Sequence, residues 1–196
     1  MVIERLRDVL QGPADQAWRS DWDISGAALL PEPAELIRAA VLMAVTQEAV
    51  PQLLLTKRTA HLRRHAGQIA FPGGRMDPGD VSPVATALRE AHEEVALEAR
   101  HVEVIGQLAP YVTGTGFSVL PVVGLVPSGL TLVPEVSEVE AIFHVPLAHA
   151  LDPANHELRE GNFRGFSSRY FVIRHGNREI WGATAAMIVN LSKLLS

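Results

Sequence analysis

Residues 71–97 read FPGGRMDPGDVSPVATALREAHEEVAL and join a glycine turn, a polar loop and a helix. In the turn, residues 71–74, two adjacent glycines permit positive φ angles and a close approach of other atoms to the backbone. After the loop, Ser82 and Pro83 form a helix-start signal, a hydroxyl N-cap followed by proline at the first helical position. The stretch therefore predicts a glycine turn that leads through a loop into a helix.

The predicted helix has one apolar and one acidic face. Apolar residues recur at helical spacing at Val84, Leu88, Ala91 and Val95. At about 100° per residue, Glu90, Glu93 and Glu94 fall on the opposite side. Carboxylates at this spacing repel one another, and a divalent cation such as Mg²⁺ would offset that repulsion with oxygen ligands. A solvated acidic face is the alternative interpretation of the same pattern.

Residues 89–97, REAHEEVAL, resemble the second half of the Nudix box, G-x5-E-x7-R-E-U-x-E-E-x-G-U, where U is aliphatic. The chain departs from this pattern at three points. Ala91 takes an aliphatic position, and Ala96 takes the place of the late glycine, so alanine must adopt a conformation that glycine makes easy. The first half, which begins at Gly74, is one residue longer, and Asp80 takes the place of the early glutamate.

A second motif precedes the box. Residues 54–59, LLTKRT, are followed in register by Arg63, Gly67 and residues 71–74. This order resembles L-L-T-K-R-[S/A]-x3-R-x3-G-x3-F-P-G-G, the signature of the coenzyme A diphosphatase sub-family of Nudix hydrolases, which also has the longer box. The resemblance implies hydrolysis of the diphosphate bond of coenzyme A, and of acyl or oxidised coenzyme A, to 4′-phosphopantetheine and adenosine 3′,5′-bisphosphate. The alternatives are hydrolysis of another nucleoside diphosphate derivative, such as ADP-ribose or NADH, and a non-catalytic Nudix-fold nucleotide sensor.

The resemblance also implies roles for individual residues. The expected ligands of Mg²⁺ or Mn²⁺ are Glu90, Glu93, Glu94 and the carbonyl of Gly74. The expected catalytic residues are the same three glutamates with Arg89 and Glu138. Arg89 is expected to organise the carboxylates by pairing with Glu93, and Glu138 to act as a further ligand, as a base, or only as a charge at the start of a strand. The expected substrate-binding residues are Lys57, Arg58, Arg63, Gly67 and Phe71. A cluster of basic residues in an acidic chain suits an anion clamp, since arginine can bind phosphate bidentately, and a solvated basic loop is the alternative interpretation.

The resemblance implies an α+β fold, the Nudix α/β/α sandwich around a mixed β-sheet in a single domain. We expect residues 1–35 to form an N-terminal helix and a surface extension, and residues 36–196 to form the Nudix hydrolase domain. The hydrophobic pattern predicts strands over residues 39–46, 52–58, 102–108 and 117–126, a hairpin at 175–177 and a closing helix over 185–195. Pro121 inside one of these strands suggests an edge or a bulge.

Composition limits the number of domains and excludes several classes of site. The chain of 196 residues is 47% hydrophobic and 20% charged, which suits one domain with a sizeable core. Its net charge of −5 argues against a broad non-specific nucleic-acid surface, and the lack of cysteine excludes disulfides, thiolate-bound zinc and thiol nucleophiles. The charged start MVIERLRD and the lack of a long apolar run predict a cytoplasmic protein. The resemblance implies a small-molecule substrate, and we expect a monomer or homodimer.

Overall fold

The computed structural model describes residues 2–11, 20–25, 36–62, 65–163 and 166–196. Within these residues the centre is an eight-stranded sheet of order β3-β2-β1-β7-β5, in which β4 pairs with β1, β6 with β7 and β8 with β2. The strands are β1 (Ile37–Gln47), β2 (Gln52–Arg58), β3 (Ile69–Ala70), β4 (Gly73–Arg75), β5 (Glu103–Gln107), β6 (Tyr111–Val112), β7 (Phe117–Pro127) and β8 (Val139–Pro146). Because β1 and β7 are parallel and the neighbouring pairs are antiparallel, the sheet is mixed.

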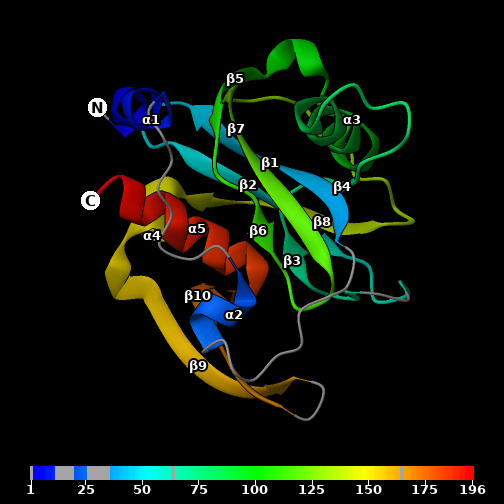
Figure 1. Cartoon of the computed structure of the whole chain (residues 1–196). Coiled ribbons are helices and arrows are strands. Elements are labelled where there is room, and N and C mark those ends of the chain that lie inside the picture. Colours follow the sequence, from blue (N-terminus) through cyan, green and yellow to red (C-terminus); the bar gives the residue numbers. More distant parts are fainter. Residues whose placement is uncertain (1, 12–19, 26–35, 63–64, 164–165) are drawn as a thin grey trace.

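Strand β1 contributes to a core on each face of the sheet, since successive side chains of a strand point to opposite faces. Leu42 and Ala44 belong to the core that also contains Ala87, Ala91 and Val95 of helix α3 (Pro83–Val95). Met43 and Val45 belong to the core that contains the buried side of helix α5 (Ala183–Leu194). Figure 1 shows α3 and α5 on opposite sides of the sheet. The predicted α/β/α sandwich and mixed sheet are therefore confirmed.

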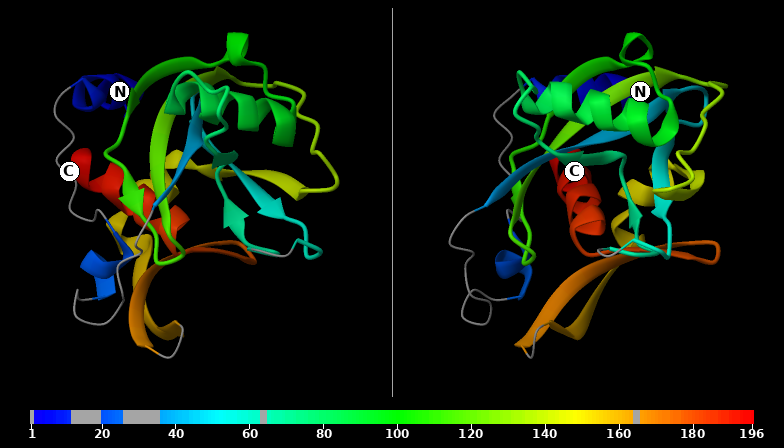
Figure 2. Two further views of the ribbon diagram at one scale, coloured as in Figure 1. Left: turned by 45° about the vertical axis from the view of Figure 1, so that its right-hand side comes forward. Right: turned by 90° about the vertical axis from the view of Figure 1, so that its right-hand side faces the viewer.

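A smaller antiparallel sheet consists of β9 (His156–Phe163), β10 (Phe166–His175) and β11 (Arg178–Trp181), in the order β11-β10-β9. Gly176, with φ 59°, lies in the turn between β10 and β11, where the sequence predicts a hairpin. Residues 155–168 look like a polar loop and strand start in the sequence, but β9 occupies most of them. Its partner β10 supplies the hydrogen bonds that a polar sequence does not reveal. Figure 2 shows β9 and β10 curving away from the main sandwich.

Pro121 lies inside β7 and pairs with Val41 of the central strand β1, so the predicted edge position applies to only one side of the residue. The other side of β7 explains why proline is tolerated there. Strand β6 pairs with Val119 and β5 pairs from Val122 onward, so Pro121 faces the gap between two partners. Its carbonyl still accepts a hydrogen bond from the Leu108 amide at 2.9 Å. A missing N–H at this point breaks no ladder hydrogen bond.

The described parts of residues 1–35 pack on the rest of the chain. Leu6 and Leu10 of α1 (Val2–Leu10) are buried in the same core as α5. The sequence suggests Trp18 and Trp22 as possible anchors of this segment. Helix α2 (Asp21–Ser25) buries Trp22, whereas Trp18 lies outside the described residues. The remaining helix, α4 (Leu147–Leu151), follows β8 directly. None of the helices in the described ranges is long and apolar enough to cross a membrane.

Both ends of α3 are capped, and only the first cap follows from the local sequence. The Ser82 hydroxyl accepts a hydrogen bond from the Ala85 amide at 3.1 Å, and Pro83 opens the first turn. At the other end, Ala96 adopts the left-handed conformation with φ 56° and ψ 28°, and its amide reaches the carbonyls of Ala91 and His92. Alanine therefore takes the conformation that the glycine of the Nudix box would take more easily.

Candidate active site

Strand β4 brings the glycine turn against the acidic side of α3. A Cβ atom on Gly73 would lie 2.5 Å from the Ala40 carbonyl oxygen, and one on Gly74 would lie 2.4 Å from the Glu90 carboxylate. A side chain at position 73 would collide with fixed backbone, whereas one at position 74 would displace the Glu90 carboxylate. The two glycines thus let the backbone of β4 lie directly beside a predicted metal ligand.

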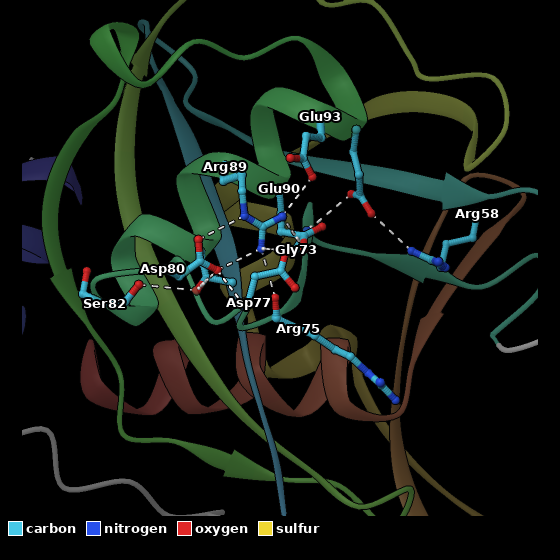
Figure 3. Close-up of polar contacts among 11 residues, drawn as sticks. Arg58, Gly73, Arg75, Asp77, Asp80, Ser82, Arg89, Glu90 and Glu93 are labelled. Atoms are coloured by element: carbon cyan, nitrogen blue, oxygen red, sulfur yellow. Dashed lines mark hydrogen bonds and ion pairs between the residues drawn. The ribbon is translucent and has the colours of Figure 1, made fainter.

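Arg89 joins the loop, the strand and the helix at the centre of the site (Figure 3). Its Nε and Nη2 donate to the two oxygens of Asp80 at 3.1 and 2.9 Å. Its Nη1 donates to Glu90 Oε1 and to Glu93 Oε2, each at 2.9 Å. Its Nη2 also reaches the Arg75 carbonyl oxygen at 3.0 Å. The predicted pairing of Arg89 with Glu93 is present, and Arg89 additionally fixes Glu90 and strand β4.

Asp80 anchors this arrangement. Besides Arg89, its Oδ2 accepts hydrogen bonds from the Asp77 amide and the Thr86 hydroxyl, each at 2.9 Å. The hydrogen bonds from Arg89 hold the pKa of the Asp80 carboxyl well below its usual range. Asp80 stands where the early glutamate of the box is expected, and here it closes the longer loop onto the helix.

Glu94 does not lie on a solvated face, because its side chain is only 4% exposed. Its Oε1 accepts a hydrogen bond from Arg58 Nη1 at 3.2 Å, and its Oε2 from the Gly73 amide at 3.3 Å. Burial raises the pKa of Glu94 to about 7, although Arg58 favours the ionised form. A shift in the β2–β8 register between Lys57 and Arg58 accompanies this contact, and such bulges redirect side chains.

The site concentrates negative charge. Burial raises the pKa of Glu90, and the charges of Glu93 and Glu138 raise it further. Glu90 and Glu138 likewise raise the pKa of Glu94, which places Glu138 within electrostatic range of both carboxylates. A divalent cation would offset this repulsion, and carboxylate and carbonyl oxygens are the donors that a hard cation prefers. The donor set therefore fits such an ion.

The carboxylates are held by arginine in this structure. Glu90 and Glu93 turn toward Arg89, and Glu94 turns toward Arg58. In the part of the chain that the structure describes, no three acidic or histidine side chains stand close enough together to hold a metal ion. Metal binding would accordingly exchange arginine contacts for metal contacts.

The predicted substrate-binding residues fall into different surroundings. Lys57 pairs with Glu140 at 2.6 Å, and Arg58 pairs with Glu94. The side chain of Phe71 is buried in the core, so it supports the glycine turn from inside. Gly67 has φ 69° in the turn between β2 and β3. Arg63 lies outside the described residues.

Two residues of the site are not among those predicted from the sequence to bind metal or substrate or to take part in catalysis. Asp80 is recognisable in the sequence only as a stand-in for the early glutamate. Arg75 directly follows the glycine turn, and its guanidinium Cζ lies 5.5 Å from the centre of the Phe117 ring. The position of Arg75 directly after Gly74 could have marked it as a site residue. Its contact with Phe117 could not be predicted, because the two residues are far apart in the sequence.

Comparison with known proteins is consistent with this arrangement. The family model described as "NUDIX domain" matches residues 36–164. The "Uncharacterized Nudix hydrolase NudL" of Yersinia pestis (strain Pestoides F) is 44% identical over 159 residues, which cover 81% of this chain and 80% of the relative. The protein of the same name from Yersinia pseudotuberculosis serotype O:1b has the same identity and coverage.

Solved structures share the fold at lower identity. A Nudix hydrolase from M. smegmatis, RenU, has a TM-score of 0.51 at 22% identity and covers 63% of this chain and 82% of its own. A MutT/nudix family protein from Enterococcus faecalis has a TM-score of 0.50 at 17% identity and covers 83% of this chain and 62% of its own. The sequence matches, together with the glycine turn and the acidic helix, lead to one conclusion: the chain belongs to the Nudix hydrolase family, whose members act on diphosphate-containing compounds and generally use divalent metal ions.

Proposed function

We propose that this protein hydrolyses the diphosphate bond of coenzyme A, free, acylated or oxidised, to 4′-phosphopantetheine and adenosine 3′,5′-bisphosphate. Hydrolysis is supported by one observation: the carboxylates of Glu90 and Glu94 meet the glycine turn at Gly73 and Gly74. Negative charge concentrated on buried carboxylates beside an open backbone suits a cation that in turn holds a diphosphate.

Glu90, Glu93, Glu94 and the carbonyl of Gly74 would hold Mg²⁺ or Mn²⁺. When bound, such an ion neutralises phosphate charge and lowers the pKa of a bound water. Arg89 acts as a positioning residue, because it fixes Glu90 and Glu93 and is itself fixed by Asp80. The Gly73 amide orients Glu94. Glu138 is available as a further ligand or as a base.

The choice of coenzyme A as substrate rests on the signature that precedes the box. Strands β2 and β3, which contain part of this signature, form a hairpin that leads to the glycine turn, since Thr56 pairs with Ala70 and Lys57 with Ile69. Arg58 leaves this hairpin toward Glu94, at the rim of the site. Planar guanidinium groups at such a rim bind phosphate oxygens well. This arrangement supports a polyanionic substrate beside the carboxylates.

Two alternatives predict different products. A Nudix hydrolase of another class would cleave ADP-ribose or NADH in place of coenzyme A. A nucleotide sensor would bind without cleavage, although a binding module has no need of three carboxylates around a glycine turn. The first experiment is mass spectrometry of products after incubation with coenzyme A, ADP-ribose and NADH, with Mg²⁺, with Mn²⁺ and with a chelator.

We expect adenosine 3′,5′-bisphosphate from coenzyme A in the presence of metal and none after chelation. Cleavage of ADP-ribose or NADH without cleavage of coenzyme A would keep the metal-dependent reaction and overturn the substrate. Absence of any cleavage would overturn the reaction itself and favour the sensor.

A further inference from the structure

Three arginines border the carboxylate cluster of Glu90, Glu93 and Glu94, and they differ in how their charge is used. Arg58 is paired with Glu94, and Arg89 is paired with Asp80, Glu90 and Glu93. Arg75 makes no ion pair with any carboxylate of the described residues, its guanidinium lies over the Phe117 ring, and its side chain is exposed. An incoming polyanion would therefore find the charge of Arg75 uncompensated.

The backbone of Arg75 belongs to the site, while its side chain extends beyond it. Its carbonyl accepts the hydrogen bond from Arg89, and Gly74 before it lies against Glu90. Since successive residues of a strand face opposite sides, the side chain of Arg75 leaves β4 away from α3. Figure 3 shows it pointing away from the carboxylates of α3. The guanidinium is thus fixed at its base beside the carboxylates, and its charged end lies on the side of β4 that faces away from them.

Phe117 forms the second half of this surface. The Arg75 guanidinium lies over its ring at 5.5 Å, and the ring is only partly buried. Both backbone polar groups of Phe117 are bound to Thr113, with its amide donating to the Thr113 hydroxyl and its carbonyl accepting from the Thr113 amide. Asp21 of α2 holds the same turn through the Gly114 amide at 2.6 Å. The aromatic ring therefore rests on a rigid turn.

We propose that Arg75 and Phe117 form a binding subsite for the phosphorylated nucleoside half of the substrate. An unpaired guanidinium binds a phosphate monoester through charge-assisted hydrogen bonds, and an aromatic ring with a stacked guanidinium offers flat surface to a nucleobase. This inference rests on the proposed function and refines it: Arg75 is the residue that distinguishes a nucleoside bearing a 3′-phosphate from one without it.

The test compares coenzyme A with 3′-dephospho-coenzyme A as substrates of the wild type and of Arg75→Met. We expect the variant to raise KM for coenzyme A about 10- to 100-fold, the loss of one charge-assisted contact, with kcat within about threefold. KM for 3′-dephospho-coenzyme A should stay within about threefold. Arg100→Met is the matched control, because Arg100 is an exposed arginine that pairs with Glu98 and with none of the three carboxylates of the cluster.

A binding measurement separates recognition from turnover. Calorimetry with adenosine 3′,5′-bisphosphate and with AMP should show that Arg75→Met removes the preference of the wild type for the bisphosphate. Phe117→Leu should weaken both nucleotides by a similar factor, since it removes the stacking surface and leaves the cation.

The outcomes of these tests separate the two proposals. An equal effect of Arg75→Met on both substrates, or a bisphosphate preference that survives in the variant, overturns the subsite. Failure of the wild type to cleave either form of coenzyme A overturns the proposed function. In that case the calorimetry alone tests whether Arg75 recognises the 3′-phosphate.

Discussion

Ala96 adopts the left-handed backbone conformation that glycine would adopt more easily. Alanine at φ 56° is strained relative to glycine, and the position is exposed, so a change there disturbs no packing. We expect Ala96→Gly to raise the free energy of unfolding by up to about 1 kcal/mol, measured by urea denaturation. Ala85→Gly, in the first turn of α3, should lower it by about 0.5–1 kcal/mol. A lower free energy of unfolding for Ala96→Gly would show that Ala96 is not strained.

Glu93 offers a test of the metal site with little risk to the fold. Its side chain is 56% exposed, so Glu93→Gln should leave the thermal unfolding midpoint nearly unchanged. We expect turnover to fall on the order of 100-fold or more, because the proposed metal site loses one ligand. Glu98→Gln, which neutralises another exposed carboxylate, is the control. Near-wild-type turnover by Glu93→Gln would rule out the proposed metal role of this residue.

Glu94 predicts an unusual pH dependence of stability in the metal-free protein. Burial raises its pKa in the folded state to about 7, above the value of an exposed glutamate, so the folded protein binds this proton more tightly than the unfolded chain. Its contribution to the free energy of unfolding is therefore full at low pH and is lost as the pH rises toward 7. We expect a decline of about 1–3 kcal/mol across this window in urea titrations.

Glu94→Gln provides the comparison for that decline, since glutamine stays neutral at every pH. The variant should lack the decline, and the difference between the two proteins isolates the contribution of Glu94. Identical pH profiles for the two proteins would show that the Glu94 carboxyl is not perturbed.

At the level of elements, the loop before α3 is held to the helix by the Asp80–Arg89 ion pair. Asp80→Ala removes acceptors for Arg89, Thr86 and the Asp77 amide, so the loop should open and Arg89 should lose its orientation. We expect kcat to fall on the order of 10-fold and amide hydrogen exchange over residues 75–82 to accelerate.

The control for this prediction is Asp77→Ala. Asp77 is exposed, and its carboxylate lies 3.7 Å from Arg89, so its loss should leave kcat and exchange nearly unchanged. Equal effects of the two variants would indicate a general charge effect rather than an anchor at Asp80.

In the whole molecule, α2 ties distant parts of the chain together. Asp21 accepts hydrogen bonds from the Tyr111 hydroxyl and the Gly114 amide, each at 2.6 Å. Ser25 exchanges hydrogen bonds with the backbone of Arg169 in β10. Helix α2 therefore connects the turn before β7 to the smaller sheet.

Asp21→Ala should leave two donors without partners and lower the free energy of unfolding by about 1–3 kcal/mol, measured by chemical denaturation. Tyr111→Phe removes one of the donors together with its hydrogen bond and should cost less. A neutral Asp21→Ala variant would show that α2 does not help to hold the turn before β7.

Much of the molecule follows from local sequence. Serine before proline, the apolar spacing and the paired glycines predict the turn and the start of α3, because capping and turn chemistry depend on neighbouring residues. The strands at 39–46 and 52–58 follow in the same way. The order of motifs also identifies the family and the three glutamates of the helix.

Only the tertiary structure decided which charges meet between different helices and strands. Arg58 and Glu94 are 36 positions apart, and their contact depends on a bulge between β2 and β8. The burial of Glu94, the stacking of Arg75 on Phe117 and the strand β9 likewise depend on partners distant in the sequence. Periodicity assigns a residue to a face of its own helix or strand, but the residue across from it is chosen by the packing of elements that the local pattern does not encode.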